Sequence, residues 1–341
     1  MSPITLRKLA AEALLASHSN RPDRVLFEDT KPTIERMGAS LVNGSFVRKD
    51  EATIGVTRIV DNNLRLICLS GIGDAIWTRG VVAETIKAGL NVYVDTVHPW
   101  VFWDFVDKPG FNFWTGQPIR YSKRIATYLG SDLRSGQTVY GAMASTCHVL
   151  KGDFSFSAKS EWVEAASSLL SLVDKPILLY RPLVHNKSRK SVTSRNPDVG
   201  VYEWLYKRIK DKFFTVAVAS AGKDEFLYND KVEADLVFCK GELPITTVIG
   251  LMSKSAVVLT NPGMALVIAA SMGIPVIGVF GGYEDSHNYI DTVVYGKSLL
   301  IDPIIPCRCM SDSHACKKEI DLNNASKLVD SFILGILGDD S

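Results

Sequence analysis

The chain has 341 residues, of which 46% are hydrophobic and 22% are charged, and its formal net charge is +1. This length allows two domains with separate cores, and the apolar fraction excludes an intrinsically disordered chain. Because the net charge is close to zero, it provides no general attraction to DNA or to an acidic membrane. Any polyanion site must therefore be a local basic patch.

Residues 1–63 predict a helix and β-hairpins ahead of the first α/β domain. Charged side chains interrupt the apolar positions between Met1 and His18, which is typical of an amphipathic helix and unlike the core of a signal peptide. Asn43-Gly44 lies between alternating runs and is a strong hairpin signal. No apolar stretch reaches the roughly 18 to 20 residues of a membrane span, so we expect a cytoplasmic protein without a transmembrane segment.

The apolar run 64–69 predicts a strand, which ends in a glycine turn and continues as a helix over residues 75–88. A second strand follows, and this order is typical of parallel sheets, which keep their ligand sites at the carboxyl ends of the strands. We expect Gly71 and Gly73 to let backbone amides approach a ligand and Asp74 to lie beside it. Taken alone, Asp74 also fits a carboxylate that only caps the helix.

A break at Asp174-Lys175-Pro176 predicts a boundary between a first domain, residues 1–173, and a second domain, residues 174–341. The second domain alternates apolar strands with helices, which predicts a doubly wound parallel sheet. The expected strands are 177–180, 213–219, 234–238, 256–259 and 274–280, and the expected helices are 200–210, 245–252 and 263–272. A helix at 159–172 would end the first domain, and a last helix at 323–336 would cross back to it.

Residues 98–114 are rich in aromatic side chains, and two interpretations stay open. In the first, the rings pack on the sheet, since aromatic side chains dominate core burial. In the second, they form an acceptor-binding wall that includes His98, Trp100 and Trp103, because stacked rings bind sugars and nucleobases.

The segment Leu69-Ser70-Gly71-Ile72-Gly73-Asp74-Ala75-Ile76-Trp77-Thr78 resembles the G-D-x-x-x-T opening of the heptosyltransferase-like glycosyltransferases, the ADP-heptose:lipopolysaccharide heptosyltransferases of family 9. The segment from Val257 to Gly281 is similar to that family's strand, Asp-Ser/Thr-Gly turn, His-x-Ala-Ala helix and final Phe-Gly strand. The resemblance covers roughly residues 64–320 by motif order. It implies the GT-B fold, in which two Rossmann-like, doubly wound α/β domains face a cleft.

Three positions depart from the family pattern. Asn261 replaces an acidic residue, Pro262 replaces Ser or Thr, and Leu266 replaces His. In the family these positions lie beside the sugar and phosphates of the donor, so the resemblance leaves the donor sugar open.

The resemblance implies an inverting, metal-independent transfer of a sugar from a nucleotide diphosphate sugar to an acceptor hydroxyl, with no cofactor beyond that co-substrate. Asp74 would be the general base that activates the acceptor. The turn Asn261-Pro262-Gly263 would aim helix amides at the leaving diphosphate.

Further donor-binding residues are expected in loops that follow strands of the second domain. They are Arg181, Lys187, Arg195, Ser220, Gly222 and Glu242. The three cations would meet the phosphates, with Lys187 or Arg195 matching the family's basic donor residue. Gly222 would permit close backbone contact, and Glu242 would bind ribose hydroxyls. An ordinary solvated surface is the alternative for the basic residues and for Glu242.

The acceptor stays open between two chemical classes. The family's commonest acceptor is a saccharide of the lipopolysaccharide core, whereas bacteriophage enzymes of the same architecture glycosylate hydroxymethylated pyrimidine bases in DNA. In the second case the basic residues of 187–195 and 207–212 would meet DNA phosphates, and the protein would work in the cytoplasm of a host. Two further alternatives are a nucleotide-sugar epimerase and a non-catalytic module that binds sugar nucleotides.

The six cysteines lack the dense, even spacing of a secreted disulfide scaffold, which predicts free thiols in a reducing compartment. Cys307, Cys309, His314 and Cys316 contain the donor types of a tetrahedral zinc site, yet their spacing matches no standard zinc motif. Some members of the family carry a similar cysteine-rich stretch. The spacing favours a packed loop without a metal.

Overall fold

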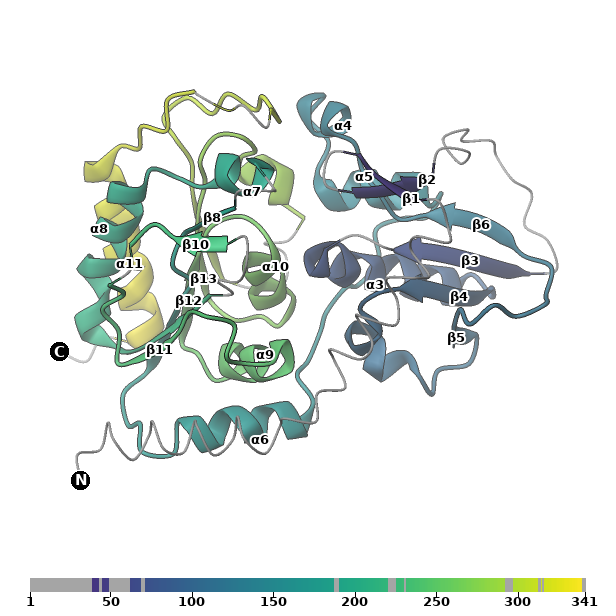
Figure 1. Ribbon diagram of the computed structural model, residues 1–341, viewed down its shortest axis with the longest axis horizontal. Helices are drawn as coiled ribbons and strands as arrows, with labels where there is room; N and C mark the ends of the chain where they lie inside the picture. Colours follow the sequence, from purple (N-terminus) through teal and green to yellow (C-terminus); the bar gives the residue numbers. More distant parts are fainter. Residues whose placement is uncertain are drawn as a thin grey trace. The chain divides into compact units, whose positions relative to one another are not determined.

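The computed structural model describes residues 39–42, 45–48, 62–68, 71–186, 190–219, 225–229, 231–291, 297–311, 314 and 316–338. The chain divides between Phe156 and Ser157 into two compact units, each built on a parallel sheet (Figure 1). The helix predicted before residue 19 lies outside the described residues. The strands β1 (Ala39–Val42) and β2 (Ser45–Arg48) pair antiparallel, which confirms the hairpin predicted at Asn43-Gly44.

The N-terminal unit has a four-stranded parallel sheet in the order β5-β4-β3-β6. The strands are β3 (Asn63–Cys68), β4 (Asn91–Thr96), β5 (Phe111–Phe113) and β6 (Ser122–Ile125). Residues 64–68 of β3 are all buried, which explains their nearly continuous apolar sequence. The winding reverses at β3, because β4 lies on one side of it and β6 on the other.

Among the described residues of this unit, the helices are α3 (Ile72–Lys87), the 3-10 helix η1 (Pro99–Phe105), α4 (Gly130–Arg134) and α5 (Val139–Thr146). A Cβ added at Gly80 of α3 would lie 1.9 Å from the hydroxyl oxygen of Tyr140 in α5 and 2.8 Å from the backbone oxygen of Gly152, so the close packing around α3 leaves no room for a side chain there. The buried Arg79 donates to both oxygens of Asp104, at 2.6 and 2.8 Å, and to Ser155 O at 2.7 Å. These bonds fasten α3 to η1.

The C-terminal unit has a six-stranded, wholly parallel sheet in the order β11-β9-β7-β12-β13-β14. The strands are β7 (Ile177–Tyr180), β9 (Phe214–Val218), β11 (Leu236–Phe238), β12 (Val257–Thr260), β13 (Val276–Val279) and β14 (Ser298–Ile301). This is the 3-2-1-4-5-6 order of dinucleotide-binding folds, so the winding reverses between β7 and β12. The predicted doubly wound sheet is confirmed. The last strand, β14, and a short antiparallel pair, β8 (Val184–Asn186) with β10 (Glu225–Leu227), were not predicted.

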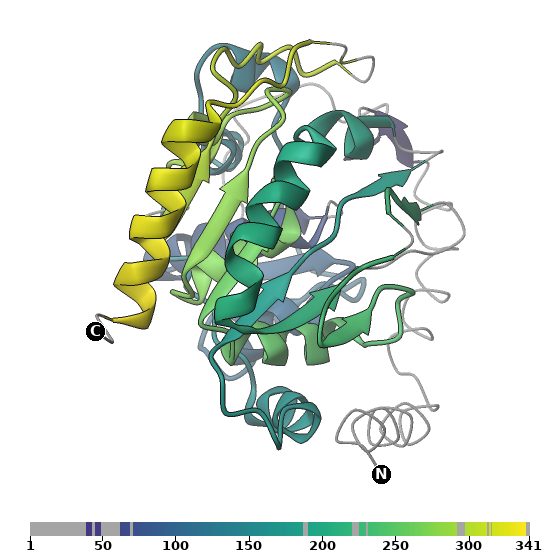
Figure 2. The same cartoon turned by 90° about the vertical axis from the view of Figure 1, so that its left-hand side faces the viewer.

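Helices cover both faces of this sheet. The helices α8 (Val199–Ile209) and α11 (Leu322–Leu337) lie together on one face (Figure 2), and α9 (Ile245–Ser253) and α10 (Met264–Ser271) lie on the other. Val329 and Ile333 of α11 belong to the core of this unit, so the last helix packs on its own unit instead of crossing back. The short helices are α7 (Lys190–Arg195), η2 (Lys210–Lys212) and η3 (Ser286–Tyr289).

The helix α6 (Ser160–Leu169), which we expected at the end of the first domain, belongs to the C-terminal unit and packs against α9. A Cβ added at Gly250 of α9 would lie 2.0 Å from Trp162 O, so the two helix backbones touch. The division therefore falls after Phe156, and Asp174-Lys175-Pro176 forms only the connection from α6 to β7. In the part of the chain that the structure describes, no helix has the length and apolar character needed to span a bilayer.

Candidate functional site

The carboxyl edge of the C-terminal sheet brings together the residues that follow β7 and β12. Arg181 N donates to Leu259 O at 3.0 Å, which continues the pairing of Tyr180 with Leu259. The hydroxyl of the buried Tyr202 lies 2.8 Å from Arg181 O and 3.2 Å from Leu259 O, so α8 holds both strand ends. Ligands of doubly wound sheets bind where the winding reverses, which makes this edge the candidate site.

The turn from β12 into α10 presents backbone amides at this edge. Gly263 has a φ of 137°, which a residue with a Cβ adopts only under strain. The backbone amides of residues 264–266 donate no hydrogen bond to any residue that the structure describes. Such an open helix N-terminus attracts anions. Pro262 is buried in the turn. The side chain of Asn261 is hydrogen-bonded within the protein, because its Nδ2 donates to Asn196 Oδ1 at 2.7 Å.

Arg181 is a half-buried cation at the same edge. Its guanidinium donates to no residue that the structure describes, although the carboxylate of Glu225 lies near enough to influence it. Burial lowers the pKa of the guanidinium, and the charge of Glu225 opposes that shift. The side chain keeps its positive charge at neutral pH and has five donors in a fixed fork, which matches the geometry of a phosphate.

Asn196 has a structural role at this edge that the sequence pattern did not indicate. It is 1% exposed, and its Nδ2 donates to Val184 O at 2.7 Å while its Oδ1 accepts from Asn261. Its carbonyl oxygen accepts from Lys318 Nζ at 2.6 Å, and burial lowers the pKa of that lysine. An asparagine in a polar segment gives no sequence signal for burial. The only feature of the sequence that could have indicated Asn196 is its position directly after the basic run 187–195.

Arg195, at the end of α7, forms an ion pair with Glu284 in the turn after β13, with 3.2 Å between Nε and Oε1. Burial raises the pKa of the Glu284 carboxyl, and the charge of Arg195 opposes this rise. A Cβ added at Gly281 would lie 2.2 Å from Asn196 O, so the end of α7 and this turn are in backbone contact. Arg195 thus has a carboxylate partner within the protein, and its role toward a donor stays a prediction.

The structure gives little evidence on whether the other predicted donor residues bind a donor. Lys187, Ser220 and Gly222 lie outside the described residues. Glu242 accepts from Lys240 N at 2.7 Å across a turn in which Gly241 has a φ of 71°. This local bond accounts for the position of Glu242 without a ligand, and a role toward ribose stays a prediction.

Asp74 is the third residue of α3 and follows the strand at which the N-terminal sheet reverses its winding. Its Oδ2 accepts from Gly71 N at 3.1 Å, which is the capping role that the sequence allowed beside a catalytic one. The helix begins at Ile72, earlier than predicted. Gly73 therefore lies in the first helical turn and Gly71 has an ordinary φ of −64°, so the expected tight glycine turn is not formed by these two residues.

The aromatic segment divides into a buried part and a partly exposed part. Phe102, Phe105 and Phe111 are buried, and the ring of Phe102 lies 6.3 and 6.1 Å from the rings of the other two. Packing in the core is therefore the correct interpretation for these three. His98, Trp100 and Trp103 are partly exposed, and a role for them in acceptor binding stays a prediction.

The second basic cluster, residues 207–212, is partly neutralised. Arg208 pairs with Asp330 of α11, and Lys210 Nζ lies 2.8 Å from a carboxylate oxygen of Glu233. These ion pairs reduce the positive charge that this surface would offer to a DNA backbone.

A surface pocket lies beside α8 and is lined by Tyr180, Tyr202 and Tyr206 together with residues 228–233. Its volume is about 60 Å³. Sites for drug-sized ligands enclose roughly 300 Å³ or more, so this pocket is too small for a nucleotide sugar.

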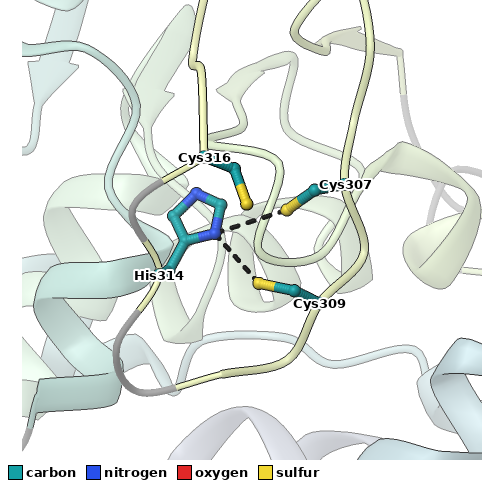
Figure 3. Close-up of side chains that lie close together, drawn as sticks. All are labelled: Cys307, Cys309, His314 and Cys316. Carbon is teal, nitrogen blue, oxygen red and sulfur yellow. Dashed lines mark hydrogen bonds between the residues drawn. The ribbon is translucent and has the colours of Figure 1, made fainter.

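The structure brings Cys307, Cys309, His314 and Cys316 into one cluster, although their spacing predicted ordinary loop packing (Figure 3). All four ligand atoms lie within 4.8 Å of one another. This donor set is suited to a tetrahedral metal ion.

No family model and no curated protein matches this sequence. Solved structures do resemble it. A family 9 glycosyl transferase from Veillonella parvula is 9% identical over 80% of this chain and 97% of its own, with a TM-score of 0.53. The ADP-heptose lipopolysaccharide heptosyltransferase II of Escherichia coli is 12% identical over 81% of this chain and 100% of its own, with a TM-score of 0.52.

A third solved structure is the iron-containing dodecameric glycosyltransferase TibC from enterotoxigenic E. coli. It is 14% identical over 81% of this chain and 76% of its own, with a TM-score of 0.55. At these identities the likeness concerns the fold. The chain therefore has the GT-B type of α/β fold found in family 9 glycosyltransferases and heptosyltransferases.

Proposed function

We propose that this protein is a glycosyltransferase that moves a sugar from a nucleoside diphosphate sugar to an acceptor hydroxyl. The observation that carries the proposal is the carboxyl edge of the C-terminal sheet, where the Arg181 cation follows β7 and the open N-terminus of α10 follows the neighbouring β12. The leaving diphosphate gains negative charge as the bond to the sugar breaks. A fixed cation and oriented amides stabilise that charge.

The transfer would be inverting and would need no metal at the reacting atoms. Asp74 would take the proton of the acceptor hydroxyl while its oxygen attacks the anomeric carbon and the nucleoside diphosphate leaves. The capping bond from Gly71 N is compatible with this role, because an ionised carboxylate has about four lone-pair sites. The fold shared with family 9 enzymes supports the same reaction class.

A saccharide acceptor is favoured over DNA. The net charge of the chain is +1, and two cations of the 207–212 cluster are paired with carboxylates. Titration with duplex DNA at several salt concentrations tests this preference. Tight binding with a steep salt dependence would reverse it in favour of a DNA-base glycosyltransferase.

The experiment that tests the proposal measures nucleoside diphosphate release from nucleotide sugars with and without saccharide acceptors. Acceptor-dependent release is expected. A donor that is isomerised in the absence of acceptor would identify an epimerase instead. A donor that binds but is never turned over with any acceptor would identify a non-catalytic sugar-nucleotide module.

A further inference from the structure

Four potential metal ligands converge in the segment between β14 and α11, at some distance in sequence from the proposed donor residues. His314 Nδ1 lies 3.3 Å from Cys307 Sγ and 3.0 Å from Cys309 Sγ, and Cys316 Sγ completes the group within 4.8 Å (Figure 3). In a tetrahedral zinc site with bonds of about 2.3 Å to sulfur and 2.0 Å to nitrogen, neighbouring donors lie about 3.5 to 3.8 Å apart. The cluster therefore needs to adjust by only about 1 Å to enclose an ion.

The histidine ring is oriented as a metal ligand would be. His314 Nε2 lies 3.0 Å from Gly281 O. A carbonyl oxygen can only accept, so Nε2 carries the proton and the lone pair of Nδ1 faces the sulfurs. A bond from the outer ring nitrogen to a backbone carbonyl is the common way in which proteins fix the ring and tautomer of a metal-bound histidine.

The backbone around Cys309 is held in an unfavourable conformation. Arg308 and Met310, on either side of it, both have a φ of 50°, in the left-handed region that residues with a Cβ seldom adopt. Arg308 N donates to Gly282 O at 2.8 Å and Met310 N to Tyr283 O at 3.3 Å, which fastens this loop to the turn after β13. Residues in this region persist only where the surrounding structure fixes their conformation, and they are frequent at functional sites.

We infer that Cys307, Cys309, His314 and Cys316 form a closed tetrahedral metal centre that fastens the loop before α11 to the turn after β13. Three sulfurs and one imidazole nitrogen are the donors of structural zinc sites, and tetrahedral sulfur-rich sites also accept iron. Four protein ligands leave no position for a substrate, so the ion stabilises structure and takes no part in sugar transfer.

The metal centre would also hold in place residues near the carboxyl edge of the C-terminal sheet, where we propose that the donor binds. The turn that it fastens contains Asp285, which pairs with Arg308 at 2.5 Å, and Glu284, which pairs with Arg195. Resting on the proposed function, loss of the ion should therefore weaken nucleoside diphosphate binding as well as stability.

Elemental analysis of the full-length protein, produced with zinc and iron in the medium and purified under reducing conditions without chelator, tests the inference. One equivalent of either metal is expected, and the analysis identifies which. Cys309→Ser and Cys316→Ser each remove one of the four ligands and should remove most of the bound metal. Cys147→Ala, which changes a buried cysteine of the other unit, should keep it.

Cobalt binding to the unaltered chain tests the same site without a variant that has to fold. Apo protein prepared from the unaltered chain should bind one equivalent of Co²⁺ and develop the visible bands of tetrahedral thiolate coordination, and Zn²⁺ should displace them. Failure of the reduced protein to bind zinc, iron or cobalt, or a disulfide among the three cysteines in the protein kept under reducing conditions, would overturn the inference. Metal binding without any nucleotide binding would refute the proposed function alone.

Discussion

Arg195 and Glu284 form an ion pair in which the carboxylate side chain is 1% exposed and the guanidinium side chain 29% exposed. Removing the cation leaves a buried charge whose desolvation is no longer offset, so Arg195→Met should lower the free energy of unfolding by about 3 kcal/mol. Adding Glu284→Gln to that variant should restore most of the loss. Urea unfolding of the two single variants and the double variant measures the coupling.

The same variants separate this structural role from the predicted donor role of Arg195. If the arginine mainly binds donor phosphates, Arg195→Met will retain its stability and lose nucleoside diphosphate affinity, and Glu284→Gln will restore nothing.

For Asp74, the chain contains a matched control. Asp132 is the third residue of α4 and its Oδ2 accepts from Leu129 N at 2.8 Å, just as Asp74 accepts from Gly71 N at the start of α3. We expect Asp74→Asn to lower turnover by about 10²- to 10⁴-fold with little change in donor affinity. Asp132→Asn should leave turnover intact, and neither change should lower stability by more than about 1 kcal/mol. Equal turnover in the two variants would mean that Asp74 is only a helix cap.

Arg181→Met should weaken the binding of nucleoside diphosphates by about 10- to 100-fold, because a hydrogen bond to a charged group contributes about 1.5 to 3 kcal/mol. Calorimetric titration with UDP and with a purine diphosphate measures the effect, and free NAD should bind neither protein. Arg208→Met is the control, since Arg208 already pairs with Asp330. Unchanged affinity in Arg181→Met would remove this residue from the site.

Gly263→Ala should lower the free energy of unfolding by about 1 to 3 kcal/mol, because alanine is strained at a φ of 137°. It should also weaken diphosphate binding by displacing the first amides of α10. Gly335→Ala provides the contrast, because Gly335 lies within α11 and an added Cβ there meets nothing within 4 Å. That change should raise stability by about 0.5 to 1 kcal/mol. A neutral or stabilising Gly263→Ala would show that the turn relaxes freely.

The Arg79–Asp104 pair predicts a pH dependence. Burial acts to raise the pKa of the Asp104 carboxyl, but the hydrogen bond and charge of Arg79 outweigh it, so the pKa falls below the usual 3.8. The stabilisation is therefore present above the pKa of the unfolded chain and is lost as the pH falls through the lower folded value. At neutral pH, Asp104→Asn should lower stability by about 2 to 4 kcal/mol, and this deficit should shrink below about pH 4.

Urea unfolding of both proteins between neutral and acidic pH measures this difference. Asp107→Asn, at a nearby exposed position, should follow the unaltered protein at every pH. If the stability lost in Asp104→Asn stays the same down to acidic pH, the negative charge of Asp104 does not have the stabilising role assigned to it.

Most strands of the C-terminal sheet could be predicted from sequence because they are buried on both faces. Residues 177–180, for example, form an uninterrupted apolar run and fold as the strand predicted. By contrast, β8 and β10 are three residues long, too short for a periodic signal. The unit boundary was misplaced because the contact of Trp162 with Gly250 is between helix backbones, which side-chain patterns do not report.

Only those residues of the candidate site that lie next to a predicted strand in the sequence could be predicted. Arg181 and Gly263 follow strands directly and could be identified from that position. Asn196 contacts residues 65 and 122 positions away, and no local pattern records such bonds. The cysteine cluster depends on left-handed turns at Arg308 and Met310, which bring together ligands whose spacing fits no familiar motif.

The helix α10 is buried at every position from Ala265 to Ser271. Such a helix is enclosed by its neighbours and cannot shift to follow a ligand, so its first amides are preorganised. A diphosphate that binds there loses little affinity to the ordering of the protein. Under the proposed function, side chains that other elements bring to the same edge would then discriminate among donor sugars.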